Sequence, residues 1–165
     1  MNIDLNGYTK ILSQRPNVVF ATHFLKTPVI TKIEYPDKYF DFSFCDAQFE
    51  DCQLPSSVLN EIQRVSKNGY IQTYHPMIEL SHCQTTDLNI PLGFFQQRWI
   101  IYISKQDNVL TFVPKYPHFK DFYFNNNEIT TYRTCYFWSG NIKYKILQNN
   151  NIVITDVIND ILMGI

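Results

Sequence analysis

The stretch FDFSFCDAQFEDCQLPSSVLNEIQRVSKNGYIQTYH, residues 40–75, carries the clearest fold signals in the chain. Its first six residues, 40–45, are apolar enough to predict a strand buried on both faces. Residues 55–69 begin with Pro and Ser, place apolar residues at helical spacing and end at a glycine, which predicts an amphipathic helix. Residues 70–75 are typical of a further strand. A strand, a helix and a strand in so short a span predict a βαβ unit with parallel strands.

Further strands are predicted on both sides of this unit, from alternating apolar residues and from β-branched residues. They cover residues 1–6, 17–22, 98–104, 109–114, 130–138 and 141–147. The last four should form two hairpins, because polar turns separate them in pairs, the second turn containing Ser139-Gly140. The final residues, 154–165, suggest a strand followed by a short amphipathic helix.

The composition limits the class of protein. With 165 residues, 45% of them hydrophobic, we expect a single domain over residues 1–165. A net charge of −1 and a pI near 6.4 argue against a general electrostatic grip on nucleic acid or on an anionic membrane. No apolar run approaches the roughly 20 residues that span a bilayer, and no signal peptide is evident. We therefore expect a cytoplasmic protein.

The cysteines and histidines are dispersed. They are Cys45, Cys52, Cys83, Cys135, His23, His75, His82 and His118. No pair has the spacing of zinc ligands, apart from the adjacent His82 and Cys83. We predict no metal site and interpret the cysteines as buried small apolar residues.

The motifs between residues 35 and 75 resemble class I S-adenosylmethionine-dependent methyltransferases of the type 11 kind. In that family a loop and an aspartate lead into the fourth strand, and EYPDKYFDF, 34–42, is similar. A Glu follows that strand, as Glu50 does here within Phe49-Glu50-Asp51. The family's next helix ends in a pattern matched by Glu61, Arg64, Val65, Lys67 and Gly69.

A weaker resemblance continues toward the C-terminus. Certain methyltransferase-like relatives place a Pro, a Glu, an Arg-Trp strand and an L-x-F-x-P-K strand in this order, similar to Pro76, Glu79, Arg98-Trp99 and 110–115. The resemblance implies a Rossmann-like α/β fold, with a mostly parallel sheet and antiparallel C-terminal hairpins. It also implies S-adenosylmethionine as the cofactor, if the protein is active.

The glycine-rich turn that holds the cofactor in this family has no counterpart here. In the best register, residues 2–6 are the family's second strand, so the first strand is missing. This register gives Asp4 the position of the ribose ligand, with a solvated turn residue as the alternative. A missing central strand leaves sheet edges unpaired. Either the family's second and fourth strands pair directly, or another chain covers the edges, and we expect a protein partner or a second copy of the chain in that place.

The candidate catalytic residues are Asp46, Glu50 and His75, which lie after the fourth and fifth strands of the implied sheet. For the acids, together with Asp51, the alternative is a set of solvated or helix-capping side chains. We expect a degenerate methyltransferase-like domain that acts as a non-catalytic binding, regulatory or structural subunit. The alternative is an active methyltransferase whose cofactor site is rebuilt or completed by a partner.

Overall fold

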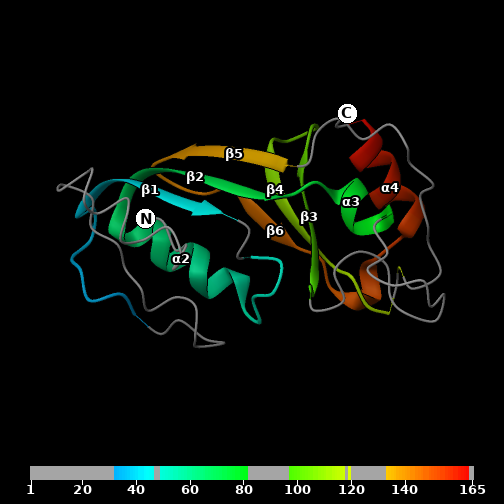
Figure 1. Cartoon of the computed structure of the whole chain (residues 1–165), viewed down its shortest axis with the longest axis horizontal. Helices are drawn as coiled ribbons and strands as arrows, with labels where there is room; N and C mark the ends of the chain where they lie inside the picture. Colours follow the sequence, from blue (N-terminus) through cyan, green and yellow to red (C-terminus); the bar gives the residue numbers. More distant parts are fainter. Residues whose placement is uncertain (1–31, 47–48, 82–96, 118, 120–132, 164–165) are drawn as a thin grey trace. The chain divides into compact units, whose positions relative to one another are not determined.

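The computed structural model describes residues 32–46, 49–81, 97–117, 119 and 133–163 (Figure 1). The chain divides into two compact units. The first contains residues 1–46, 53–72 and 137–142, and the second contains residues 47–52, 73–136 and 143–165. The single domain expected over the whole chain stays a prediction. Asp4 and the predicted strands at 1–6 and 17–22 lie outside the described residues.

The first sheet contains the predicted βαβ unit. Its elements are β1 (Phe40–Asp46), α2 (Pro55–Val65), β2 (Ser66–Tyr74) and β5 (Arg133–Ser139). Strands β1 and β2 are parallel, from Phe40 opposite Ser66 to Asp46 opposite Gln72, which confirms the βαβ prediction. Strand β5 lies on the other side of β2 and runs in the opposite direction (Figure 1).

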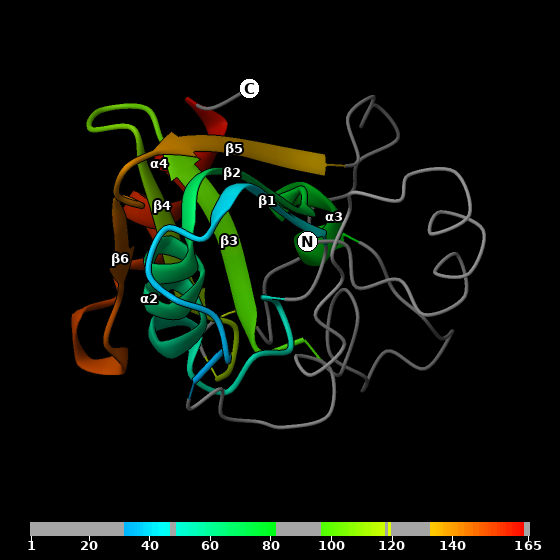
Figure 2. The ribbon, with the colours of Figure 1, turned by 90° about the vertical axis from the view of Figure 1, so that its left-hand side faces the viewer.

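Helix α2 covers one face of this sheet (Figure 2). Its buried residues are Pro55, Val58, Leu59, Ile62 and Val65, which recur at helical spacing as predicted. Along β1, Ser43 and Cys45 are buried, whereas Phe42 is 52% exposed. The prediction that this strand is buried on both faces is therefore wrong.

The helix ends four residues earlier than predicted, at Val65. Ser66 is already extended and pairs with Phe40, so the start of the parallel ladder ends the helix. Gly69 consequently lies within β2 and does not cap the helix. A Cβ atom at Gly69 would lie 2.6 Å from Ser43 Oγ and 2.7 Å from the Trp138 ring, so the glycine is needed for close packing.

The second unit contains another three-stranded sheet. Its elements are α3 (Pro76–Ser81), β3 (Trp99–Ser104), β4 (Val109–Pro114), β6 (Tyr144–Ile146), η2 (Asn149–Asn151) and α4 (Ile154–Leu162). Strands β3 and β4 form the predicted antiparallel hairpin, and β6 pairs with β4 in parallel. A core cluster joins α3, α4 and this sheet. Its buried members are Met77, Leu80, Ile100, Tyr102, Val113, Phe119, Val157, Ile158 and Ile161.

The second predicted hairpin is wrong, because β5 and β6 belong to different sheets. Gly140 does turn the chain after β5, with a φ of 73°. Its N–H group then donates to Lys67 O at 2.9 Å, and the Ile142 N–H group donates to the Gln63 side chain at 3.0 Å. The polar groups that a hairpin would use are thus bonded to the end of α2 and the start of β2.

The predicted Rossmann-like fold, with a mostly parallel sheet, is also wrong. The described residues form two small mixed sheets, in the orders β1-β2-β5 and β3-β4-β6. Each has one parallel pair of strands with known register. Hydrophobic periodicity predicts where a strand lies, but the partner of that strand is set by contacts distant in sequence. No helix in the described part of the chain is long and apolar enough to cross a membrane.

Candidate functional site

Two residues of the methyltransferase-like motif, Glu61 and Arg64, join helix α2 to the segment before β1. Arg64 donates from Nη1 to Asp37 Oδ1 at 2.7 Å and to Tyr35 O at 2.9 Å, and from Nη2 to Ile33 O at 2.9 Å. Its Nε atom donates to Glu61 Oε2 at 3.0 Å. The pKa of Glu61 is lowered chiefly by this hydrogen bond from Arg64. These hydrogen bonds hold the segment before β1 against α2. The guanidinium donors of Arg64 are used within the protein.

The three candidate catalytic residues do not share one unit. Asp46 ends β1 in the first unit, where it is half-buried and accepts a hydrogen bond from Gln72 Nε2 at 3.0 Å. Glu50 and His75 belong to the second unit. Their assignment as catalytic residues stays a prediction.

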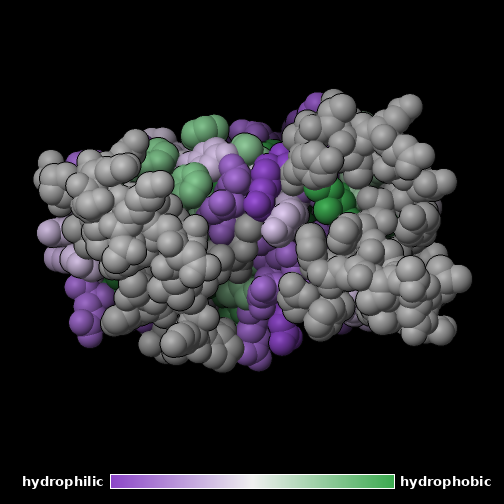
Figure 3. Space-filling view, viewed as in Figure 1, coloured by the Kyte–Doolittle hydropathy of each residue, from purple (hydrophilic) through white to green (hydrophobic). Residues whose placement is uncertain are grey.

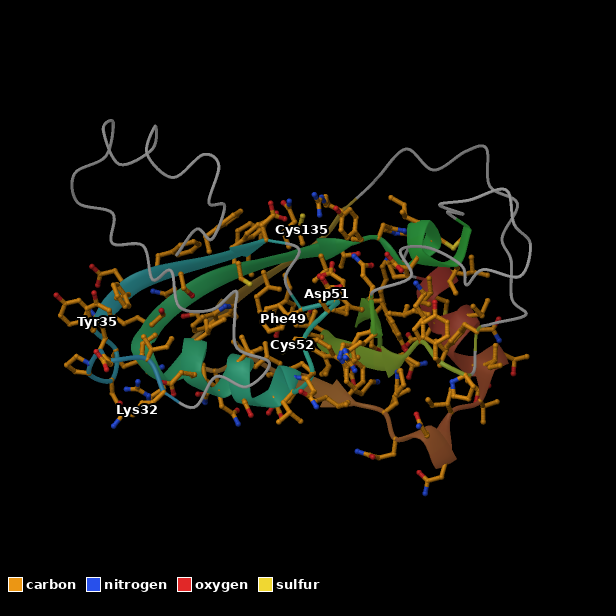
Figure 4. All side chains as sticks on the ribbon, turned by 60° about the horizontal axis from the view of Figure 1, so that its bottom comes forward. Lys32, Tyr35, Phe49, Asp51, Cys52 and Cys135 are labelled. Atoms are coloured by element: carbon orange, nitrogen blue, oxygen red, sulfur yellow. The ribbon has the colours of Figure 1, made fainter. Side chains whose placement is uncertain are left out.

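Glu50 is buried, with 1% of its surface exposed. It lies in the segment between β1 and α2, where its neighbours Phe49, Asp51 and Cys52 are labelled in Figure 4. The Tyr74 N–H group donates to Glu50 Oε1 at 2.7 Å, whereas Oε2 has no hydrogen-bond partner among the described residues. The main-chain oxygen of Glu50 accepts the N–H group of Arg98 at 2.6 Å. Glu50 is therefore held firmly by its backbone and by one side-chain oxygen.

The environment of Glu50 favours its protonated form. Burial raises the pKa of this carboxyl from 4.5 to about 7, and the charges of Glu79 and Asp51 add to the increase. The hydrogen bond from Tyr74 opposes the shift because it stabilises the carboxylate. Near neutral pH, Glu50 can thus both release and accept a proton.

A buried ion pair in the second unit joins two residues that are distant in sequence. Lys115 Nζ lies 2.7 Å from Glu79 Oε2, and both side chains are 1% exposed. In the amide orientation that satisfies its hydrogen bonds, Gln97 also donates to the Glu79 carboxylate. Burial lowers the pKa of Lys115, while Glu79 opposes that shift. The two buried charges compensate each other, as buried charges must.

The sequence patterns predicted no helix around Glu79, but the structure places this residue in α3, where it is buried. Pro76 begins helix α3, and Met77, Ile78 and Leu80 are buried along it. The proline, with apolar residues at three of the next four positions, was a signal for a short buried helix. No pattern in the sequence around Glu79 indicated that its partner would be Lys115, which follows β4.

His75 stands between β2 and α3 and is half-buried. Its Nδ1 atom accepts the Met77 N–H group at 3.2 Å, which satisfies one of the free donors at the start of α3. Burial lowers the pKa of His75, so the imidazole is neutral at neutral pH. The geometry therefore gives His75 a structural role at the start of this helix.

A group of aromatic side chains lies on the face of the first sheet that α2 does not cover. We call it the open face; within the first unit it consists of Phe42, Phe44, Tyr70 and Phe137. Phe44 and Tyr70 stack with ring centroids 5.2 Å apart, and Tyr70 and Phe137 meet at 4.6 Å. Phe42 and Phe137 are 52% and 72% exposed. Hydrophobic surface is visible over β1 and β5 in Figure 3.

The described glycines do not fit the cradle that S-adenosylmethionine requires. They are Gly69 and Gly140. The space beside Gly69 is filled by Ser43 and Trp138, and Gly140 turns the chain after β5, where no helix follows. Neither lies in a turn from a strand into a helix, where backbone N–H groups would face a ligand.

No group of three or more His, Cys, Asp or Glu side chains in the described ranges could hold a metal ion. Among the cysteines of those ranges, Cys45 is buried as predicted. Cys52 is half-buried and Cys135 is exposed, so the prediction that all are buried is wrong for Cys135.

Comparisons with known proteins found no relatives: no protein-family model, no curated protein and no solved structure matches this chain. The methyltransferase resemblance therefore rests on the quoted motifs alone.

Proposed function

We propose that the protein acts in the cytoplasm as a non-catalytic binding subunit, related to the methyltransferases, that contacts another protein chain. The open face carries this proposal. When helices cover both faces of a sheet, its aromatic residues are buried in the core. Here α2 covers one face, and the other presents exposed Phe42 and Phe137. Exposed aromatic residues gathered on one surface are typical of interaction sites.

The placement of the candidate catalytic acids also supports a binding role. Glu50 is buried and Asp46 is bonded to Gln72, so neither carboxylate is freely presented to a methyl acceptor. The described glycines, moreover, do not form a turn that could hold the phosphate or nucleoside part of a ligand.

The test is a calorimetric titration of the full chain with S-adenosylmethionine. We expect no binding in the micromolar range, because neither glycine in the described part of the chain lies in a turn that could hold the cofactor. A dissociation constant in that range would contradict the proposal. A thermal-unfolding series with the same compound gives a second reading, since a ligand that binds the folded state raises the midpoint.

The second candidate function is methyl transfer with Glu50 as the general base. It is favoured by one observation, the pKa of Glu50 near 7, because a base works best when its pKa lies near the working pH. If the chain transfers a methyl group, Glu50→Gln should abolish the activity. Asp51→Asn is the matched control, since it neutralises the adjacent but exposed acid. Equal activity in both variants would reject Glu50 as the base.

A further inference from the structure

We propose that loss of the proton from Glu50 releases residues 49–52, which we call the Glu50 segment, from the ends of β2 and β3. The inference goes beyond the proposed binding function and does not depend on it. It concerns a local opening within the second unit, to which all the residues used below belong. The Glu50 segment carries the labels Phe49, Asp51 and Cys52 in Figure 4.

Hydrogen bonds of Glu50 attach the segment to both strands. Its main-chain oxygen accepts the N–H groups of Arg98 at 2.6 Å and Trp99 at 3.2 Å, at the start of β3. Its side chain accepts the N–H group of Tyr74, at the end of β2, at 2.7 Å. A further bond runs from Trp99 Nε1 to Cys52 O at 2.6 Å. A displacement of the Glu50 side chain therefore disturbs the attachment of the whole segment.

The buried charges of the second unit leave Glu50 without a counter-ion in the described part of the chain. Glu50, Glu79 and Lys115 are each 1% exposed. Lys115 Nζ lies 2.7 Å from Glu79 Oε2, so its charge compensates that of Glu79. Glu50 Oε2 has no hydrogen-bond partner among the described residues. Because an uncompensated carboxylate is unstable when buried, the folded position of Glu50 suits the neutral acid.

The nearby acids strengthen this preference. Burial is the main reason that the pKa of Glu50 rises to about 7, and the negative charges of Glu79 and Asp51 add to the increase. Burial also raises the pKa of Asp51, although Arg98 and Lys115 oppose that shift. No cation of the described residues is among the groups that lower the pKa of Glu50. Ionised Glu50 is therefore stabilised by moving into water.

The release should depend on pH in a defined way. In the open segment Glu50 is in water and has its ordinary pKa of 4.5, whereas the closed segment keeps the proton up to about pH 7. Opening should therefore become about tenfold more favourable for each pH unit between these two values, and level off above the upper one. It also exposes Phe49, which is 1% exposed and meets Phe112 with ring centroids 6.0 Å apart.

The experiment is amide hydrogen exchange of the full chain, measured residue by residue from about pH 5 to about pH 8 by nuclear magnetic resonance. After correction for intrinsic exchange, the protection of the Tyr74, Arg98 and Trp99 amides should fall about tenfold per pH unit up to about pH 7. It should not respond to low concentrations of urea, because a local opening exposes little surface.

Two amides of the same unit report on global unfolding. The Leu110 N–H group donates to Lys143 O at 3.0 Å, and the Leu147 N–H group donates to Phe112 O at 2.9 Å, in the ladder between β4 and β6. Both should be better protected than the amides bonded to Glu50, and their protection should fall when urea is added. Equal protection and equal urea dependence in the two sets would overturn the inference, because only global unfolding would then release the segment.

Substitutions assign the effect to one carboxyl. Glu50→Gln cannot ionise, so the protection of the Tyr74, Arg98 and Trp99 amides should no longer fall as the pH rises. Asp51→Asn, the matched change at the exposed neighbouring acid, should keep the wild-type profile. His75 cannot produce the effect, since its lowered pKa favours opening at low pH instead.

A wild-type profile in Glu50→Gln, or protection that does not change with pH in the wild type, would also overturn the inference. If Glu50→Gln does not fold, the comparison of the two sets of amides in the wild-type chain decides alone.

Discussion

At the scale of single residues, Glu50 is the most informative side chain. It was singled out from its place after a strand, but its character comes from its surroundings. One oxygen accepts the Tyr74 N–H group, the other has no partner in the described part of the chain, and burial raises the pKa to about 7. The ionised form of a carboxyl is destabilised in this environment, because burial removes the charge from water.

Glu50 should make the stability of the protein depend on pH. Because its pKa rises from 4.5 to about 7 on folding, the folded state holds this proton more tightly than the unfolded state. The stability that Glu50 contributes is therefore fully present below pH 4.5 and is lost as the pH rises through about 7. The loss should be roughly 3 kcal/mol.

The variant Glu50→Gln tests this effect by urea unfolding across the same pH range. Glutamine resembles the protonated acid, so the variant should lose the Glu50 contribution of roughly 3 kcal/mol and keep the smaller contributions of other shifted groups, such as His75 and Asp51. Glu34→Gln, the same substitution at an exposed glutamate, should keep the wild-type dependence. A wild-type profile in Glu50→Gln would contradict the assignment.

At the scale of secondary-structure elements, the Glu79–Lys115 pair connects α3 to the end of β4. It is fully buried, with an Nζ to Oε2 distance of 2.7 Å. By contrast, Asp41 and Lys67 form a pair at the same distance on the surface. Because exposed pairs are screened by water and buried ones are not, the two pairs should differ strongly in their contribution to stability.

A double-mutant cycle measures this difference. Lys115→Met and Glu79→Leu, made singly, should each cost about 3–5 kcal/mol, because each leaves a buried charge without its partner. The double variant should cost much less than the sum of the two. In the exposed pair, Lys67→Met should cost less than ~1 kcal/mol. Additive costs for the buried residues would show that the pair is not coupled.

At the scale of the whole molecule, the chain forms two compact units that share strands. Strands β2 and β5 each contribute residues to both units. The chain contains two tryptophans, with Trp138 in the first unit and Trp99 in the second. Each unit therefore has its own fluorescent reporter.

We expect the two units to unfold together, because a unit cannot lose its part of β2 or β5 without disturbing a strand of the other. The variants Trp99→Phe and Trp138→Phe each leave one reporter. In each variant, the fluorescence and far-ultraviolet circular dichroism transitions in urea should coincide. Separate transitions would show that the units unfold independently.

Sequence patterns predicted the local elements well. The apolar spacing from Val58 to Val65 marks a helix, and the flanking runs mark two strands that a single crossover helix makes parallel. The β3–β4 hairpin was equally predictable, because its polar turn separates two strands that are neighbours in sequence. The resemblance also pointed to Glu50 and Glu79, both of which are buried in the structure.

Only the tertiary structure decided how these elements combine. The strands divide between two mixed sheets, and β5 and β6 separate although a turn joins them. The Glu79–Lys115 pair, the burial of Glu50 and the exposure of Phe137 likewise depend on distant segments. The physical reason is that a helix or a turn is stabilised by bonds between near neighbours, which composition and spacing record. Sheet partners, burial and pKa values depend on which remote residues the folded chain brings together.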